Sequence, residues 1–228
     1  MALVERPAQR GKFITFEGLD GCGKSTQLEK LAAALRERGI DLITTREPGG
    51  TAIGERIRAL LLDSRTRGLA SHAEMAMMVA SRAQLTAEVI LPELRAGKWV
   101  LCDRYVDSTE AYQGAGRELG SQPVLELHRL LCRDLWPDLT ILMDSDVSAS
   151  VNRARARNRA AGPGLDENRF EKESRVFFQR VYDGYQEIAR REPQRVALVD
   201  ARPPIATVHE EIVQIVTQRL LADQIAER

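Results

Sequence analysis

KFITFEGLDGCGKST, residues 12–26, is the stretch of sequence that decides the fold. Its first apolar residues, Phe13 to Phe16, are aromatic or β-branched, a pattern that predicts a short buried strand. The residues GLDGCGKS at 18–25 then fit the phosphate-binding pattern G-x-x-x-x-G-K-[ST] at every fixed position. Glycines at this spacing let the backbone turn tightly, so that its N–H groups can surround an anion. The stretch therefore predicts a strand, a phosphate-binding loop and a helix in direct succession.

The residues after the loop support this prediction. Leucine and alanine recur at helical spacing from Leu28 to Leu35, and Gly39 follows as a C-terminal cap. The positive end of this helix favours a phosphate, Lys24 can reach the phosphate oxygens, and the Ser25 hydroxyl can coordinate Mg²⁺ held by them. We therefore expect a bound nucleoside triphosphate, with a glycine-rich turn that binds no ligand as the alternative. The residues expected to bind it are Gly18, Leu19, Asp20, Gly21, Cys22, Gly23, Lys24, Ser25 and Thr26.

The composition is typical of an ordinary soluble domain. The 228 residues include 33 basic and 33 acidic side chains, so the net charge is zero and gives no general attraction to nucleic acid or to an anionic membrane. No apolar run is long enough to span a bilayer. Cys22, Cys102 and Cys132 lack the spacing of a disulfide pair or a metal site, which is typical of free thiols in the cytoplasm. We expect a single domain at 12–228 after a flexible N-terminal lead-in at 1–11.

Further apolar runs alternate with helical patterns along the chain. The runs that predict strands, besides 13–16, are 40–45, 99–102, 139–143 and 195–199. Long helices are expected at 71–96, 123–135 and 171–191, and a capping box of Thr207 and Glu210 is expected to begin the last helix. Strands that alternate with helices form parallel sheets covered on both faces. The sequence therefore predicts an α/β protein of three layers, with a five-stranded parallel sheet between two layers of helices.

Charged residues follow two of the predicted strands, at the edge of the sheet where open α/β folds bind their ligands. Arg46 begins the loop REPGGT after the second strand, with a solvated loop arginine as the alternative. Asp103 follows the third strand, where a carboxylate can provide the second support for Mg²⁺ beside Ser25. The next segment, 108–114, is polar and aromatic, a mixture suited to a nucleobase pocket.

An arginine-rich segment follows the fourth strand and ends at a Gly-Pro-Gly break, residues 162–164. Its arginines are Arg153, Arg155, Arg157 and Arg159. Alternate positions cannot all share one face of a helix, so some of these side chains must face solvent. We expect the segment at about 147–170 to form a mobile lid over the site, with a solvated basic helix as the alternative.

Five motifs, taken in this order, resemble those of the thymidylate kinase family over residues 12 to about 221. Besides the phosphate loop, they are REPGGT at 46–51, DRY at 103–105 with STEAYQG at 108–114, PDLTILMD at 137–144 and RARAR at 153–157. The resemblance implies the P-loop nucleoside-monophosphate kinase fold and a homodimer packed through helices. It also implies transfer of the γ-phosphoryl group of ATP to the 5′-phosphate of dTMP, giving dTDP and ADP.

The resemblance implies a role for each residue that matches a family motif. Lys24, Ser25 and the loop glycines would hold ATP and Mg²⁺, with Asp103 as the second metal support. Arg46 and Arg104 would hold the phosphate of dTMP. The residues expected around its nucleoside are Met78, Arg82, Thr109 and Gln113 at the thymine, and Tyr112 with Asp20 at the deoxyribose, where they would disfavour a 2′-hydroxyl.

The phosphate loop of this chain contains no arginine, whereas some relatives place a catalytic arginine there. The resemblance is therefore to the bacterial type, in which the lid supplies this charge. Arg153 and Arg157 are four residues apart and would share a helix face, so we expect the lid charge to come from them. Lys24 and Arg104 complete the expected catalytic set.

Two positions depart from the family pattern. Met78 stands where many relatives have a phenylalanine that stacks on thymine, and its polarizable thioether can also contact an aromatic ring. Asn168 stands where the lid commonly has an aspartate, and Asp166 or Glu167 could replace that carboxylate. Within the phosphate loop, Cys22 is either a small packing residue or a reactive thiolate favoured by the neighbouring N–H groups.

Two other functions remain open at this point. Another P-loop nucleoside or nucleotide kinase would share the phosphate loop, but it would not require REPGGT together with STEAYQG. A non-catalytic module that responds to bound nucleotide is the other alternative, and the complete set of charged residues argues against it. A GTPase would need an Asn-Lys-x-Asp motif, which the sequence lacks.

Overall fold

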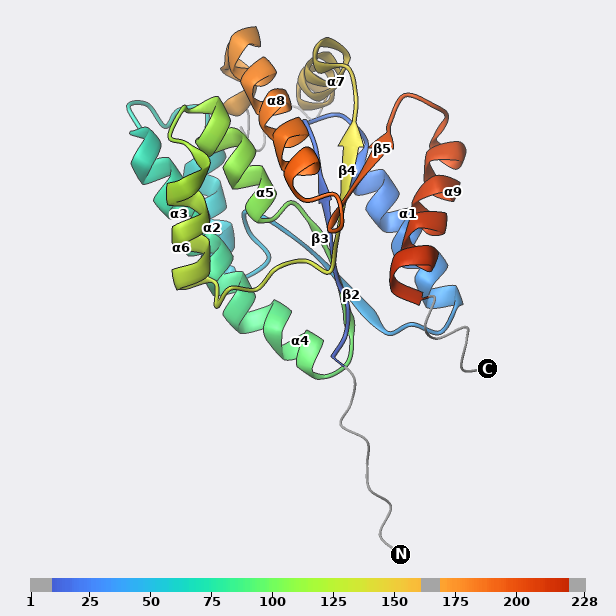
Figure 1. Ribbon diagram of the computed structural model, residues 1–228. Helices are drawn as coiled ribbons and strands as arrows, with labels where there is room; N and C mark the ends of the chain where they lie inside the picture. The colour runs from blue at the N-terminus through green and yellow to red at the C-terminus, as the bar shows by residue number, and fades with distance from the viewer. Residues whose placement is uncertain (1–9, 161–168, 222–228) are drawn as a thin grey trace, which may run out of the picture.

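In the computed structural model, the described residues are 10–160 and 169–221, and they contain one parallel sheet of five strands. The strands are β1 (Phe13–Glu17), β2 (Leu42–Arg46), β3 (Trp99–Asp103), β4 (Leu139–Asp144) and β5 (Val196–Asp200). Their order across the sheet is β2-β3-β1-β4-β5, so β1 lies at the centre, between β3 and β4. The phosphate loop, which follows β1, therefore starts from the middle of the sheet (Figure 1).

Helices cover both faces of the sheet, so the predicted three-layer α/β architecture is confirmed (Figure 1). On one face, α1 (Lys24–Glu37) and α9 (Ile205–Val216) share an apolar core with β1, β4 and β5. The other face carries α3 (Ser71–Leu85), α4 (Leu91–Arg95), α5 (Val106–Thr109), α6 (Ser121–Leu131) and α8 (Arg175–Arg191). The remaining α-helices of the described part are α2 (Ala52–Leu62), which packs on α3, and α7 (Val147–Ala160), which follows β4. Short π-helical segments at Glu110–Gly116 and Thr217–Leu221 and a 3₁₀ turn at Phe170–Lys172 lie between or after them.

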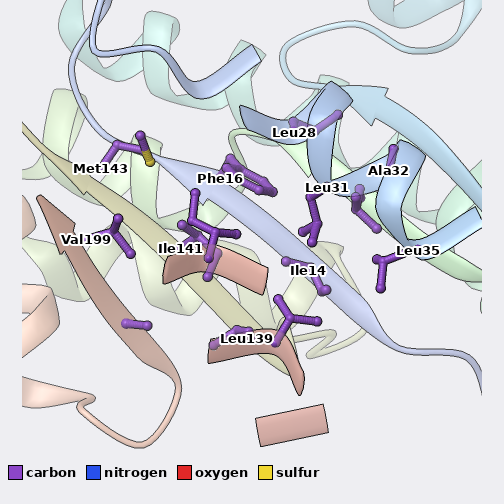
Figure 2. Packing of buried hydrophobic residues seen from close by; sticks show 14 of the residues in the cluster. Ile14, Phe16, Leu28, Leu31, Ala32, Leu35, Leu139, Ile141, Met143 and Val199 are labelled. Atoms are coloured by element: carbon purple, nitrogen blue, oxygen red, sulfur yellow. The ribbon is translucent and has the colours of Figure 1, made fainter. Parts of the chain in front are cut away.

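The central strand is buried on both sides, and this burial fixes the position of the phosphate loop. Ile14 and Phe16 face α1, whereas Phe13 belongs to the core formed with α3, α4 and α6. Figure 2 shows Ile14 and Phe16 lying against Leu31 and the other apolar residues of α1. Fully burying a side chain such as Leu31 contributes about 1.5–3 kcal/mol. The loop between β1 and α1 is therefore held at both ends by elements that are anchored in the core.

Charged residues gather at one edge of the sheet because all of its strands are parallel. The last residues of the five strands are Glu17, Arg46, Asp103, Asp144 and Asp200. Asp103 is paired in register with Phe16 on one side and with Arg46 on the other. The ends of neighbouring strands therefore meet where open α/β sheets bind their ligands.

The predicted strand boundaries are wrong by one or two residues, for a common reason. The runs predicted at 99–102, 139–143 and 195–199 each continue through an aspartate, because the backbone ladder extends to the site edge whatever the polarity of the last side chain. Strand β2 likewise begins at Leu42 and includes Arg46, where the sequence predicted 40–45.

Four of the helix predictions also need correction, and the first is the helix predicted at 123–135, which runs from Ser121 to Leu131 instead. The helix predicted at 71–96 is continuous, but a π-helical turn at Thr86–Ile90 joins α3 to α4 and accommodates Pro92, which lacks an N–H group. The capping-box prediction is wrong, because α9 already begins at Ile205, directly after the extended Pro204. The helix predicted from residue 171 begins at Arg175 instead, because the Ser174 hydroxyl accepts a hydrogen bond from the Phe177 N–H and caps it.

Several predictions fall wholly or partly outside the described residues. The lead-in was expected at 1–11, and of these only Arg10 and Gly11 are described; Gly11 is buried and its N–H donates to the Leu94 carbonyl at 2.9 Å. Within the expected lid, the break at 162–164 and Asn168 also lie outside. Among the described residues, no helix has the length and apolar character needed to cross a membrane.

A buried histidine supports the floor of the site. His128 of α6 is fully buried, its Nε2 lies 3.0 Å from the Leu135 carbonyl oxygen, and its ring meets Tyr105 edge to face at 5.4 Å. Tyr105 follows Arg104 and lines the cleft described below. Burial, assisted by the charge of Arg82, lowers the pKa of His128 to about 3.

This shift predicts a loss of stability on mild acidification. The unfolded chain takes up the proton near pH 6.5 and the folded chain does not, so the stability is complete above pH 6.5 and falls as the pH drops toward 3. Between pH 7 and pH 5, the wild type should lose about 2 kcal/mol more unfolding free energy than His128→Gln. Urea denaturation at pH 7 and pH 5 measures the unfolding free energy of each protein. His72→Gln, at an exposed histidine, is the control and should behave like the wild type. Parallel losses in the wild type and His128→Gln would contradict the prediction.

Candidate active site

The phosphate loop has the backbone that its glycines predicted. Gly18, Gly21 and Gly23 have φ angles of +130°, +81° and +102°, a region that residues with a Cβ rarely adopt. The buried ammonium of Lys24 donates to the carbonyl oxygens of Gly18 and Leu19 at 3.1 and 2.9 Å, so it lies inside the loop. The loop and the start of α1 therefore form the concave, positively polarised surface that a phosphate group requires.

Cys22 lies within this loop but faces the protein interior. Its side chain is buried in the core between the sheet and α1. A reactive thiol needs access to solvent, so burial favours the interpretation of Cys22 as a small packing residue.

Two oxygen donors meet at the mouth of the loop. The Ser25 hydroxyl donates to Oδ2 of Asp103 at 2.6 Å, although 78 residues separate them in the chain. Hydroxyl and carboxylate oxygens are ligands that Mg²⁺ accepts. No cluster of three or more His, Cys, Asp or Glu side chains that could hold a metal occurs among the described residues, so phosphate oxygens would have to complete any metal shell here.

Arg104 joins the phosphate loop to a neighbouring cleft. It has a φ of +73°, and its guanidinium lies 2.7 Å from Oδ1 of Asp20 in the loop. It also donates to the hydroxyls of Ser108, Tyr185 and Tyr112 at 2.9, 3.1 and 3.3 Å. Although burial opposes ionisation, the charges of Arg104 and Lys24 hold the pKa of Asp20 well below its usual range.

Glu17 shares the hydrogen-bond partners Ser108 and Tyr185 with Arg104 and was not identified from the sequence. This fully buried carboxylate accepts hydrogen bonds from the Tyr105 N–H at 2.6 Å, from the Ser108 hydroxyl, and from the Tyr185 hydroxyl at 3.1 Å. Burial and the nearby Asp107 raise the pKa of Glu17 to about 7. The signal available in the sequence was a carboxylate at the end of an otherwise apolar strand, since buried ionisable groups cluster at functional sites.

A buried ion pair, Arg82 with Glu47, lies in the same cleft. Arg82 donates to Glu47 at 2.8 Å, to the Tyr105 carbonyl at 3.1 Å and to the Thr109 hydroxyl at 2.6 Å. Burial raises the pKa of Glu47 to about 7 against the opposing charge of Arg82. Oε1 of Glu47 and Nη1 of Arg82 have no hydrogen-bond partner among the described residues, and buried atoms of this kind are satisfied by ordered water or by a ligand.

The cleft has a volume of about 140 Å³, is open to solvent and brings together most of the residues predicted to bind substrate. Those that line it are Asp20, Met78, Arg82, Arg104, Thr109, Tyr112 and Gln113, together with the predicted catalytic Arg157. Arg46 does not line it, because its exposed guanidinium pairs with Glu55 at 3.0 Å. Lining residues that the sequence did not indicate include Glu47, Arg58, Leu62 and Phe170.

The arginines of α7 contact different parts of the protein, as their spacing predicted. Arg153 donates to the Gly21 carbonyl oxygen at 2.7 Å and therefore contacts the phosphate loop. Arg157, one turn later, lines the cleft. Arg155 instead contacts the Glu173 carbonyl oxygen at 3.4 Å. The side chain of Arg159 lies outside the described residues.

A loop for a triphosphate beside a cleft rich in arginine, on a parallel sheet of this order, is the arrangement of a P-loop nucleotide kinase. A family model for thymidylate kinase matches residues 16–212. The thymidylate kinase of Desulfovibrio desulfuricans is 51% identical over 192 residues, covering 84% of this chain and 88% of that protein. The thymidylate kinase of Solidesulfovibrio magneticus is 46% identical over 208 residues, covering 91% of this chain and all of that protein.

A solved structure agrees with these sequence relatives. The crystal structure of thymidylate kinase from Ehrlichia chaffeensis superimposes with a TM-score of 0.72 at 34% identity, covering 91% of this chain and 99% of that one. The chain belongs to the thymidylate kinase family, as its motifs indicated. It is an ATP-dependent kinase that phosphorylates dTMP to dTDP.

The contact between the phosphate loop and α7 generates a prediction. A Cβ at Gly21 would lie 2.3 Å from the Ser150 carbonyl oxygen and 2.9 Å from the Ala154 nitrogen, so Gly21→Ala must push α7 and Arg153 off the loop. We expect kcat/KM for ATP to fall by about a hundredfold, the scale of an ångström-sized misplacement. Steady-state kinetics measures this fall.

Gly39→Ala is the matched control for this prediction. Gly39 has a similar φ of +80°, but its Cβ would meet no atom within 4 Å. It should cost about 1–2 kcal/mol of stability through backbone strain and leave turnover unchanged. Wild-type kinetics for Gly21→Ala would show that α7 does not need this contact.

Proposed function

We propose that dTMP occupies the cleft with its phosphate at Arg104 and its base beside Arg82, and that ATP lies on the phosphate loop. The observation that carries this proposal is the 2.7 Å ion pair between Arg104 and Asp20, which puts a cation of the cleft directly against the triphosphate loop. The γ-phosphate of ATP and the 5′-phosphate of dTMP can then lie next to each other. The reaction is in-line transfer of the γ-phosphoryl group of ATP to the 5′-phosphate of dTMP.

The two ends of the cleft suit the two ends of dTMP. At the phosphate end, burial opposes the charge of Arg104, yet Asp20 raises the pKa of this guanidinium further, so Arg104 stays cationic. At the base end, Arg82, Thr109 and Gln113 offer hydrogen bonds to thymine, and the half-buried Met78 offers its thioether to the ring face. Arg46 holds the acceptor phosphate only if it leaves Glu55.

Tyr112 supports the discrimination against ribonucleotides. Its hydroxyl lies 3.2 Å from Asp20 and 3.3 Å from Arg104, and the Arg104 guanidinium lies 5.1 Å from its ring centre. The ring edge of Phe170 fixes it from another side at 5.7 Å. A tyrosine held in this way leaves little room for a 2′-hydroxyl on the sugar, which favours deoxyribose.

Ser25 and Asp103 fit the Mg²⁺ that this family's chemistry implies. Their oxygens are already 2.6 Å apart at the mouth of the loop, and both are hard donors. When bound, Mg²⁺ would offset the negative charge that develops on the phosphate groups during transfer. Ser25 and Asp103 would hold it from the protein side, and Lys24 would bind the remaining phosphate oxygens.

The arginines of α7 supply the catalytic charge in this proposal. Arg153 reaches the phosphate loop and Arg157 reaches the cleft, so between them they border both substrates. A guanidinium can bind two phosphate oxygens at once and keeps its charge throughout the reaction. The segment at 147–170 would act as the lid that brings these arginines onto the transferring group.

We further propose that the protein is a cytoplasmic homodimer that binds small molecules rather than nucleic acid. Ile53 and Leu60 of α2 are 50% and 51% exposed, and such apolar side chains on one helix suit a contact between copies. Cys22, Cys102 and Cys132 are all free and buried, which suits a reducing compartment. The zero net charge gives no general attraction to nucleic acid.

The test of the function is a coupled ADP-release assay with ATP, Mg²⁺ and a panel of nucleoside monophosphates. We expect dTMP to give the highest kcat/KM, because the base end of the cleft offers hydrogen bonds and a thioether contact to thymine. The Lys24→Ala variant, which lacks the ammonium of the phosphate loop, serves as the blank for contaminating kinases. A higher kcat/KM for another monophosphate would overturn the proposed substrate placement.

The second experiment tests the catalytic arginines. Arg153→Ala and Arg157→Ala should each lower kcat by about a hundredfold or more, with much smaller changes in KM for dTMP, because their charge acts in the transition state. Arg157→Lys should restore only part of the loss, since an ammonium lacks the two-pronged geometry. Arg155→Ala, on the same helix but directed toward Glu173, is the control and should cost less. Equal small losses in all three alanine variants would place the catalytic charge elsewhere.

A further inference from the structure

A buried carboxylate lies directly behind the base end of the cleft. Glu74 of α3 is only 1% exposed and is not among the residues that line the cleft. Its Oε1 accepts from Nε2 of Gln113 at 2.8 Å and from Nε of Arg117 at 3.1 Å. Its Oε2 accepts from Nη2 of Arg117 at 3.1 Å and pairs with Nη1 of Arg169 at 2.7 Å. Glu74 therefore connects α3, the base end of the cleft and the segment that carries Arg169.

The surroundings of Glu74 keep it ionised. Burial opposes the charge, but the hydrogen bonds from Arg117 and Gln113 and the charge of Arg169 lower the pKa of Glu74 below its ordinary value. The arginines are themselves held, because Arg117 lies 4.7 Å over the ring of Phe177 and Arg169 lies 4.4 Å over that of Phe170. The carboxylate is thus fixed in place as well as in charge.

An ionised carboxylate can only accept hydrogen bonds, and this settles the orientation of the Gln113 amide. The amide must turn its NH₂ group toward Glu74, because the reverse orientation would set two acceptor oxygens against each other. The carbonyl oxygen of Gln113 is then the part of the amide left for the cleft that this residue lines. A base bound beside Gln113 would therefore meet a hydrogen-bond acceptor at this position.

We infer that Glu74 is a positioning residue for base selection, acting through Gln113. The inference rests on the proposed placement of dTMP with its base beside Gln113. Thymine and uracil carry an N–H donor at N3, which matches an acceptor, whereas cytosine carries an unprotonated acceptor there and is repelled. A neutral residue at position 74 would let the amide turn over and present its NH₂ group instead, which suits cytosine.

The experiment compares dTMP and dCMP as substrates for Glu74→Gln, Gln113→Ala and the double variant. Glu74→Gln should lower the ratio of kcat/KM for dTMP to kcat/KM for dCMP by about tenfold or more, the scale of one mismatched hydrogen bond. Gln113→Ala should lower the same ratio. In the Gln113→Ala background, Glu74→Gln should change the ratio no further, because the group through which Glu74 acts is gone.

Glu110→Gln is the matched control. Glu110 is also a buried carboxylate, 3% exposed, but its two oxygens accept hydrogen bonds from Arg191 at 2.6 and 2.9 Å, whereas Gln113 donates to Glu74. Its variant should lower the melting temperature as Glu74→Gln does and leave the substrate ratio unchanged. If the ratio falls equally in Glu110→Gln, loss of stability alone accounts for the effect of Glu74→Gln, and the inference is overturned.

The outcomes separate this inference from the proposed function. A ratio that falls in Gln113→Ala but not in Glu74→Gln overturns the role of Glu74 and leaves dTMP where we propose it. If the ratio is unchanged in both variants, the base does not lie beside Gln113. Both the role of Glu74 and the proposed placement of dTMP then fail. If Glu74→Gln does not fold, Glu74→Asp keeps the charge among the arginines but withdraws it from Gln113 by one methylene. It should lower the ratio in the same direction, and a wild-type ratio would overturn the inference.

Discussion

Arg104 lies between the phosphate loop and the cleft. Its guanidinium is 2.7 Å from Asp20, and this ion pair fixes the position of the cleft relative to the loop. Its left-handed φ of +73° is backbone strain for a residue with a Cβ, and the surrounding hydrogen bonds to Ser108, Tyr112 and Tyr185 hold it there. The site also buries the carboxylates of Glu17 and Glu47, each of which would cost several kcal/mol if it were left unpaired. The site is therefore a set of charges that are tolerable only together.

Buried ion pairs of this kind give little net stability compared with apolar side chains of the same size, because taking two charges out of water costs about as much as their attraction returns. Their contribution here is orientation. Arg82 is held by Glu47 and Thr109, and Gln113 is held by Glu74, so the groups that face the cleft have few other positions available. The stability of the fold comes instead from the apolar layers on either side of β1 (Figure 2).

The sequence predicted the architecture well because its strongest signals are local. A glycine-rich loop between an apolar strand and an amphipathic helix needs no distant partner to be recognised, and the alternation of apolar runs with helices defined the layers. Glu17, Glu47 and Glu74 were missed because a carboxylate in a sequence suggests solvent, and only the fold shows that each is buried against a distant partner. Tyr185, for example, reaches Glu17 across 168 residues. For Arg46, the motif match predicted contact with the substrate phosphate but could not predict its ion pair with Glu55.

Ligand binding would stabilise the folded protein at two atoms, Oε1 of Glu47 and Nη1 of Arg82. Neither atom has a hydrogen-bond partner among the described residues. An unmet buried polar group costs about 1–3 kcal/mol, so a base that satisfies both atoms returns this free energy to the folded state. Binding to the native state alone raises stability with the logarithm of ligand concentration. In a cell, the fraction of chains exposed to proteases would then fall as the nucleotide pool rises, and the lifetime of the protein would follow the supply of its substrate.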